Sequence, residues 1–134
     1  MIKPMNVFDI SGRAMSAQLV RLNATASNLA NAGAISGSKE SAFRALKPVF
    51  RTVSESPAVA TVEVSNVVRA GVEPTRRHSP GHPLADQNGD VWEAGVDAAA
   101  ELVEMIETSR QYQNNVQVIQ TAKSLTLDTL RLGQ

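Results

Sequence analysis

Residues that break helices are confined to the middle of the chain. Residues 1–32 hold one proline and one glycine, and residues 97–134 hold no proline and only Gly133. Five of the six prolines and six of the eight glycines lie between Gly33 and Val96. Since proline and glycine interrupt helices and favour turns, we expect helices at the two ends and strands and turns in the centre.

The N-terminal helix is predicted over residues 9–31. Either Asp9 or Ser11 can cap its start with a side-chain oxygen, and Asn31 before Ala32-Gly33 supplies a stop signal. Its apolar and small residues follow a heptad a/d spacing, which is typical of helices that pack lengthwise. These residues are Phe8, Gly12, Met15, Leu19, Leu22, Ala26 and Leu29.

The C-terminal helix is predicted from Val96 to about Leu132, on the order of 50 Å long. A helix of that length needs a partner, since amphipathic helices gain most of their stability from packing. The N-terminal helix is the obvious one, so we expect an antiparallel, coiled-coil-like hairpin. About a dozen residues of the longer helix then have no partner in the same molecule and should find one in another molecule.

The centre is predicted to hold two strands, over residues 43–53 and 59–68, joined by a turn at 54–57. Val62 and Val64 alternate with polar residues, as in a strand with one covered face. Residues 74–89 form either an ordered irregular connector or a disordered loop. The fold class is therefore α+β, with an N-terminal helix in residues 1–32, a β-rich insert in 33–91 and a C-terminal helix in 92–134.

Composition narrows the functional classes. Thirteen basic residues balance thirteen acidic ones, which argues against binding nucleic acid through bulk charge. The absence of cysteine removes disulfides and thiolate chemistry. The first thirty residues lack the order of a cleavable secretory signal, and no run approaches the ~20 apolar residues of a membrane span. Aromatic residues make up only 4%, which favours helix packing over a ligand pocket.

Three groups of residues could carry chemistry, and each has a simpler explanation. His78 and His82 are four positions apart, but Pro80 and Gly81 between them exclude a helical metal pair, so a solvated loop is expected. Glu101, Glu104 and Glu107 share a helix face, where a solvated acidic face is commoner than an acid/base pair. The stretch 76–78 (RRH) is too short to indicate nucleic-acid binding. We expect no enzymatic activity, catalytic residue, cofactor or metal site.

Two terminal segments carry a resemblance to a known family. Residues 14–18 (AMSAQ) and 21–31 (RLNATASNLAN) resemble the N-terminal signature of the bacterial flagellar rod, hook and filament axial proteins. Residues 104–118 and 124–134 are similar to the C-terminal helix of the rod subgroup. Within that subgroup, residues 7–10 (VFDI) and 80–86 (PGHPLAD) resemble the proximal-rod members.

The resemblance implies a structural subunit of the proximal rod in the flagellar basal body, which assembles into a helical tube and transmits torque for motility. Partners would be copies of itself, other rod proteins, the basal-body ring and the base of the export gate. The protein would reach the periplasm-spanning rod through type III export without a cleaved signal peptide, and would neither bind nucleic acid nor insert directly into a membrane.

The residues expected to form the assembly interface lie on both helices: Phe8, Met15, Leu19, Leu22, Asn28, Leu29, Asn31, Leu102, Ile106, Tyr112, Asn115, Val116, Ile119, Leu127, Leu130 and Leu132. An alternative is a soluble helical adaptor or regulatory protein that uses the same rod-like helical hairpin. In that case the heptad residues of the N-terminal helix would form the inside of an isolated hairpin. Genes for other rod and hook proteins beside this one would favour the rod subunit.

Overall fold

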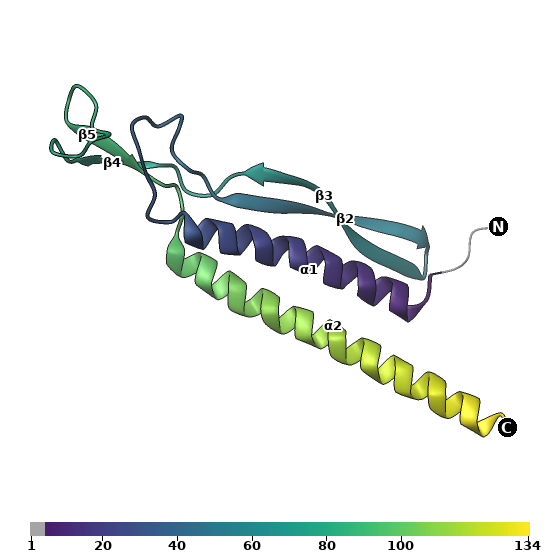
Figure 1. Ribbon diagram of the computed structural model, residues 1–134. Coiled ribbons are helices and arrows are strands. Elements are labelled where there is room, and N and C mark those ends of the chain that lie inside the picture. Colours follow the sequence, from purple (N-terminus) through teal and green to yellow (C-terminus); the bar gives the residue numbers. More distant parts are fainter. Residues whose placement is uncertain (1–4) are drawn as a thin grey trace.

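The computed structural model describes residues 5–134 and has two long helices separated by short strands (Figure 1). The elements are α1 (Val7–Ala30), β1 (Ile35–Ser36), β2 (Leu46–Ser56), β3 (Val59–Arg69), β4 (Thr75–His78), β5 (Asp90–Glu93) and α2 (Ala98–Leu132). Strands β2 and β3 form one antiparallel hairpin, and β1, β5 and β4 form a small antiparallel sheet in that order. The predicted α+β class is confirmed.

Helix α1 begins earlier than expected because Asn6, and not Asp9 or Ser11, is its cap. The Asn6 side chain accepts a hydrogen bond from the Asp9 N–H at 3.0 Å, and the Asp9 carboxylate accepts one from the Asn6 N–H at 3.1 Å. This reciprocal capping box satisfies two backbone donors that the first helical turn leaves free. At the other end the Asn31 amide donates to the Ser27 carbonyl at 2.8 Å.

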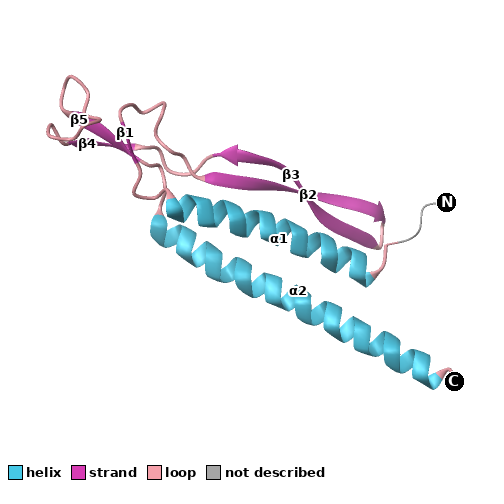
Figure 2. Cartoon of the chain, viewed as in Figure 1, coloured by secondary structure: helices cyan, strands magenta, loops and turns pink. Residues whose placement is uncertain are grey.

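The hairpin of β2 and β3 confirms the two predicted strands and shifts their turn. Ser56 pairs with Val59, so the turn consists of Pro57 and Ala58 rather than residues 54–57. The hairpin lies along one side of α1 while α2 lies along another, so α1 is the middle layer (Figure 2).

The connector over residues 74–89 is ordered, and the alternative of a disordered loop is wrong. It contains β4, which pairs with β5 from Thr75↔Glu93 to His78↔Asp90. The turn that follows is held by Asp86, whose carboxylate accepts hydrogen bonds from the N–H groups of Asn88 and Asp90 at 2.8 and 3.0 Å. These backbone donors, the Asp90 N–H first, lower the pKa of Asp86 below its usual value.

Gly95 marks the junction between the strands and α2. Its N–H donates to the Phe43 carbonyl at 2.7 Å, and its own carbonyl accepts from the Ala45 N–H at 3.2 Å. A Cβ at this position would lie 2.2 Å from the Val72 carbonyl oxygen, so only glycine fits between these backbone segments. After the junction, Asp97 caps α2 by accepting from the Ala100 N–H at 3.1 Å.

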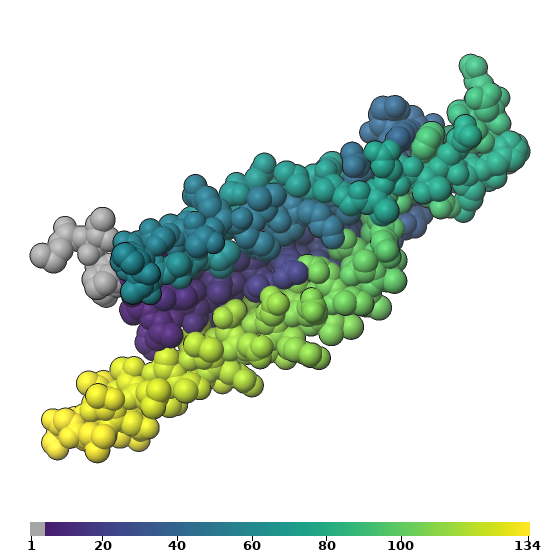
Figure 3. Space-filling model, turned by 180° about the vertical axis from the view of Figure 1, so that it is seen from behind, coloured from purple at the N-terminus to yellow at the C-terminus, as the bar shows by residue number. Residues whose placement is uncertain are grey.

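Helices α1 and α2 run antiparallel, and their lengths differ as predicted. Helix α1 has 24 residues and α2 has 35, so the end of α2 continues past the start of α1 (Figure 3). Every residue from 123 to 134 is exposed. We call residues 123–132 the overhang.

The buried apolar core within residues 5–134 is small: Ala17, Ala24, Ala42, Ala45, Val91 and Ala94. It contains no fully buried leucine, isoleucine or aromatic residue among those described, although the chain has many leucines. Since burial of large side chains supplies most of the stability of a domain, the isolated subunit gains little from its own packing.

Candidate assembly surfaces

The buried side chains of α1 and α2 are polar or small. The buried residues of α1 are Ser11, Ala17, Ala24, Thr25 and Asn28, and those of α2 are Glu101 and Thr108. Across the contact the Gln18 amide donates to the Gln111 carbonyl oxygen at 2.9 Å, and Arg21 forms an ion pair with Glu104. These polar contacts join the two antiparallel helices, and none of the large apolar side chains of either helix is among the buried residues.

The heptad residues of α1, which we call the α1 seam, do not form the buried contact of the subunit. They are Phe8, Gly12, Met15, Leu19, Leu22, Ala26 and Leu29. Phe8 and Leu19 are exposed, as are Gly12 and Ala26, whereas Met15, Leu22 and Leu29 are half-buried. At 3.6 residues per turn, the exposed positions lie on the side of α1 turned away from the buried stripe that faces both the hairpin and α2. Four of the seven seam positions therefore point out of the molecule, and the other three are only half-buried.

The expected interface residues of α2 fall into three groups. Leu102 and Ile106 are exposed near its start. The middle positions are half-buried: Tyr112, Asn115, Val116 and Ile119. In the overhang, Leu127, Leu130 and Leu132 are 45%, 62% and 89% exposed. The leucines of the overhang lie beyond the start of α1, where none of the described residues covers them.

Asn28 is expected from the sequence to lie at the assembly interface, but its side chain makes hydrogen bonds inside the subunit. Its side chain is completely buried, donates to the Leu46 carbonyl at 3.0 Å and accepts from the Leu46 N–H at 2.7 Å. One amide therefore holds the first residue of β2 against α1. Asn31 likewise serves a local purpose as the C-cap of α1.

The prediction of a solvated acidic face on α2 is wrong for Glu101. Its side chain is 3% exposed and pairs with Lys47 on β2 at 2.5 Å, while its second carboxylate oxygen has no hydrogen-bond partner. Glu104 is paired with Arg21, and only Glu107 remains exposed. The three-residue spacing of these glutamates in the sequence does not reveal the contact with Lys47, because only the tertiary fold brings β2 against α2.

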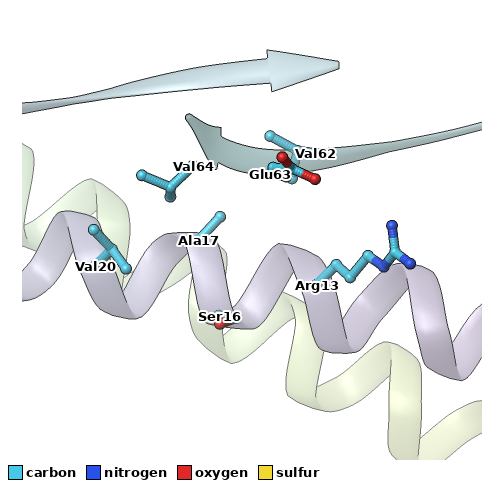
Figure 4. Close-up of a pocket in the computed structure, with 7 residues that line it drawn as sticks. All are labelled: Arg13, Ser16, Ala17, Val20, Val62, Glu63 and Val64. Atoms are coloured by element: carbon cyan, nitrogen blue, oxygen red, sulfur yellow. The ribbon is translucent and has the colours of Figure 1, made fainter. Parts of the chain in front are cut away.

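Two of the grooves beside α1 lie against different elements. One, of about 370 Å³, lies between α1 and β3 and is lined by Arg13, Ser16, Ala17, Val20, Val62, Glu63 and Val64 (Figure 4). The other, of about 610 Å³, lies where α1 begins and is lined by Val7, Asn114, Gln117, Val118, Thr121, Ala122 and Leu125. Sequence reasoning missed the second groove, although Val118 and Leu125 are seven positions apart, which is a helical spacing.

The two histidines make polar contacts with different partners. His78 Nδ1 lies 2.9 Å from a carboxylate oxygen of Asp90, and His82 Nδ1 accepts from the Leu84 N–H at 3.0 Å. Within residues 5–134 no three metal-ligating side chains cluster, and no helix is both long and apolar enough to cross a membrane. The basic stretch is also paired rather than free, with Arg77 2.6 Å from Glu93 and Arg76 3.7 Å from Asp90.

Comparison with known proteins assigns the family. Residues 8–33 match the family described as flagella basal body rod protein, and residues 87–132 match the C-terminal family of flagellar basal body rod FlgEFG proteins. The flagellar basal-body rod protein FlgC of Salmonella typhimurium is 44% identical over 132 residues, which cover 97% of this chain and 98% of that protein. The chain belongs to the FlgC family of flagellar basal-body rod proteins.

Other FlgC proteins show how far this similarity extends. The FlgC of Yersinia enterocolitica is also 44% identical over 97% of the chain, and that of Buchnera aphidicola subsp. Schizaphis graminum is 35% identical over 97%. As a member of the FlgC family the chain is a structural protein of the basal-body rod, and the adaptor alternative has no support among these relatives. The matched segments contain α1, α2 and most of the exposed leucines.

Proposed function

We propose that this chain is a structural subunit of the proximal rod, where it assembles with copies of itself and with other rod proteins into a helical tube that transmits torque. The observation that supports this most directly is the arrangement of side chains in α1 and α2. The buried residues of both helices are small or polar, whereas Phe8 and Leu19 of the α1 seam and the leucines of the overhang are exposed. Such a subunit gains its apolar burial from its neighbours.

The coiled-coil-like pairing expected from the heptad repeat is then an intersubunit feature. The α1 seam and the overhang are different surfaces, so a contact between them is heterologous and can repeat along a screw axis. A tube built in this way has many lateral contacts, which is what a shaft under torque needs. The helices of residues 1–32 and 92–134 would form its axial part, and the insert of 33–91 would lie outside.

The small core supports a path through the type III export apparatus without a cleaved signal peptide. A subunit with little internal apolar burial unfolds at little cost, and its terminal helices lose their main stabilisation when neighbours are missing. The terminal helices are therefore expected to be only marginally stable in the monomer, to unfold for export and to be held in place by neighbours after assembly. The rod would then span the periplasm between the basal-body ring with the export-gate base and the more distal rod proteins.

A matched pair of substitutions tests the rod role. Leu19→Asp places a carboxylate on the exposed α1 seam, where burial without a partner costs several kcal/mol. Asn66→Asp adds the same charge at an exposed position of β3, on the hairpin rather than on α1. We expect Leu19→Asp to abolish swimming and the recovery of hook–basal bodies, whereas Asn66→Asp should retain both. Basal bodies that form normally without any copy of this chain would overturn the role.

A further inference from the structure

Within residues 5–134, no part of the subunit covers the overhang. The bond between Gln18 and Gln111 fixes where α2 lies along α1. Leu130 follows Gln111 by 19 positions, which is about 28 Å along α2. Because α1 runs antiparallel to α2 and starts at Val7, it does not extend as far as Leu130. The exposed leucines of the overhang therefore need a surface on another molecule.

The exposed half of the α1 seam matches the overhang in length and character. Residues 123–132 span about 15 Å of helix, and the seam from Phe8 to Leu19 spans about 17 Å. No seam position carries a charge. In the last turns of the overhang, Asp128 and Arg131 lie 3.8 Å apart and form an ion pair. Burial of this segment therefore leaves neither of these two charges without a partner of opposite sign.

The size of this contact indicates what kind of partner it serves. Four leucines, even when completely buried, remove on the order of 500 Å² per partner, below the roughly 800 Å² of a stable interface. A single pair of molecules would not remain associated through it. A contact that each copy makes twice, once with its overhang and once with its α1 seam, suits an assembly of many copies.

Given the rod role proposed above, we propose that the overhang of one copy packs on the α1 seam of the next copy. The overhang supplies Leu125, Leu127, Leu130 and Leu132, and the seam supplies Phe8, Met15 and Leu19. The contact is head-to-tail. It also extends the groove beside Val7, because Leu125 belongs both to that groove and to the overhang.

Disulfide crosslinking tests this contact cleanly because the chain has no cysteine. A chain with both Leu19→Cys and Leu130→Cys cannot close a bond within itself, since the two positions are far beyond the ~7 Å that a disulfide allows between Cα atoms. We expect mild oxidation of cells assembling rods from this variant to give a ladder of covalent oligomers. Each single variant alone should give no ladder, and the two coexpressed should give only heterodimers.

The control pairs Leu130→Cys with Glu55→Cys, an exposed position near the hairpin turn, and should give no ladder. A photo-crosslinking residue at position 130 independently reports which neighbour lies there, and we expect the attached peptide to come from residues 8–19 of another copy. Attachment mainly to a different rod protein, or rods that assemble and rotate without any crosslink between the two positions, would overturn the contact while leaving the rod role intact. Absence of the unmodified chain from basal bodies would overturn the role itself.

Discussion

Replacing the overhang leucines by glutamine should separate assembly from the stability of the isolated subunit. Leu127, Leu130 and Leu132 are 45%, 62% and 89% exposed, so Leu→Gln at all three removes little packing from the monomer. Glutamine is nearly as good a helix former as leucine. At ~1.5–3 kcal/mol for a fully buried leucine, weighted by these exposed fractions, neighbours in the rod would lose about 3–6 kcal/mol of burial per subunit.

That loss corresponds to a decrease of roughly a hundredfold to ten-thousandfold in the association constant per contact. The triple variant should therefore be made and exported but yield no complete hook–basal bodies. Its free energy of unfolding in isolation, from urea titration followed by circular dichroism, should stay within ~0.5 kcal/mol of the unmodified chain.

The control for this experiment lies in the same segment. Asp128→Asn with Arg131→Gln removes an exposed ion pair worth ~0–1 kcal/mol and keeps every leucine, so rods should still form. If the triple variant assembles complete rods, or if it is destabilised in isolation by several kcal/mol, then the leucines do not act between subunits and the reasoning fails.

Three further substitutions probe the subunit itself. Asn28→Ala leaves the N–H and C=O of Leu46 without their buried partner and should cost about 2–4 kcal/mol in urea unfolding, against almost nothing for the exposed Asn23→Ala. Gly95→Ala forces a Cβ onto the Val72 carbonyl and should cost at least ~2 kcal/mol, whereas Gly12→Ala, with nothing within 4 Å, should stabilise α1 by ~0.5–1 kcal/mol. Because its pKa is lowered in the folded chain, Asp86 stabilises its turn above pH ~4 and loses that effect on further acidification; Asp86→Asn should remove this acid dependence of amide exchange at Asn88 and Asp90.

Local signals in the sequence were enough to predict the elements but not their contacts. Breaker-free ends and β-branched alternation predicted two helices and a hairpin, because helix and strand formation depend on neighbours along the chain. The N-cap of α1 is Asn6 and not Asp9, because Asp9 is the partner of Asn6 at the third helical position of a reciprocal capping box. The difference in helix length, and with it the overhang, was also predictable from the sequence.

The tertiary structure decided which face of each helix is buried. The sequence shows a heptad spacing of apolar and small residues on α1, and periodicity alone cannot tell whether such a stripe faces the same molecule or a neighbour. Docking of the hairpin through Asn28 and Leu46 assigns one side of α1 to β2, and Arg21 with Glu104 assigns another to α2. Phe8 and Leu19 are left on the remaining side, whereas Leu22 and Leu29 are half-buried. Glu101 meets Lys47 for the same reason: residues 54 positions apart are brought together only by the fold.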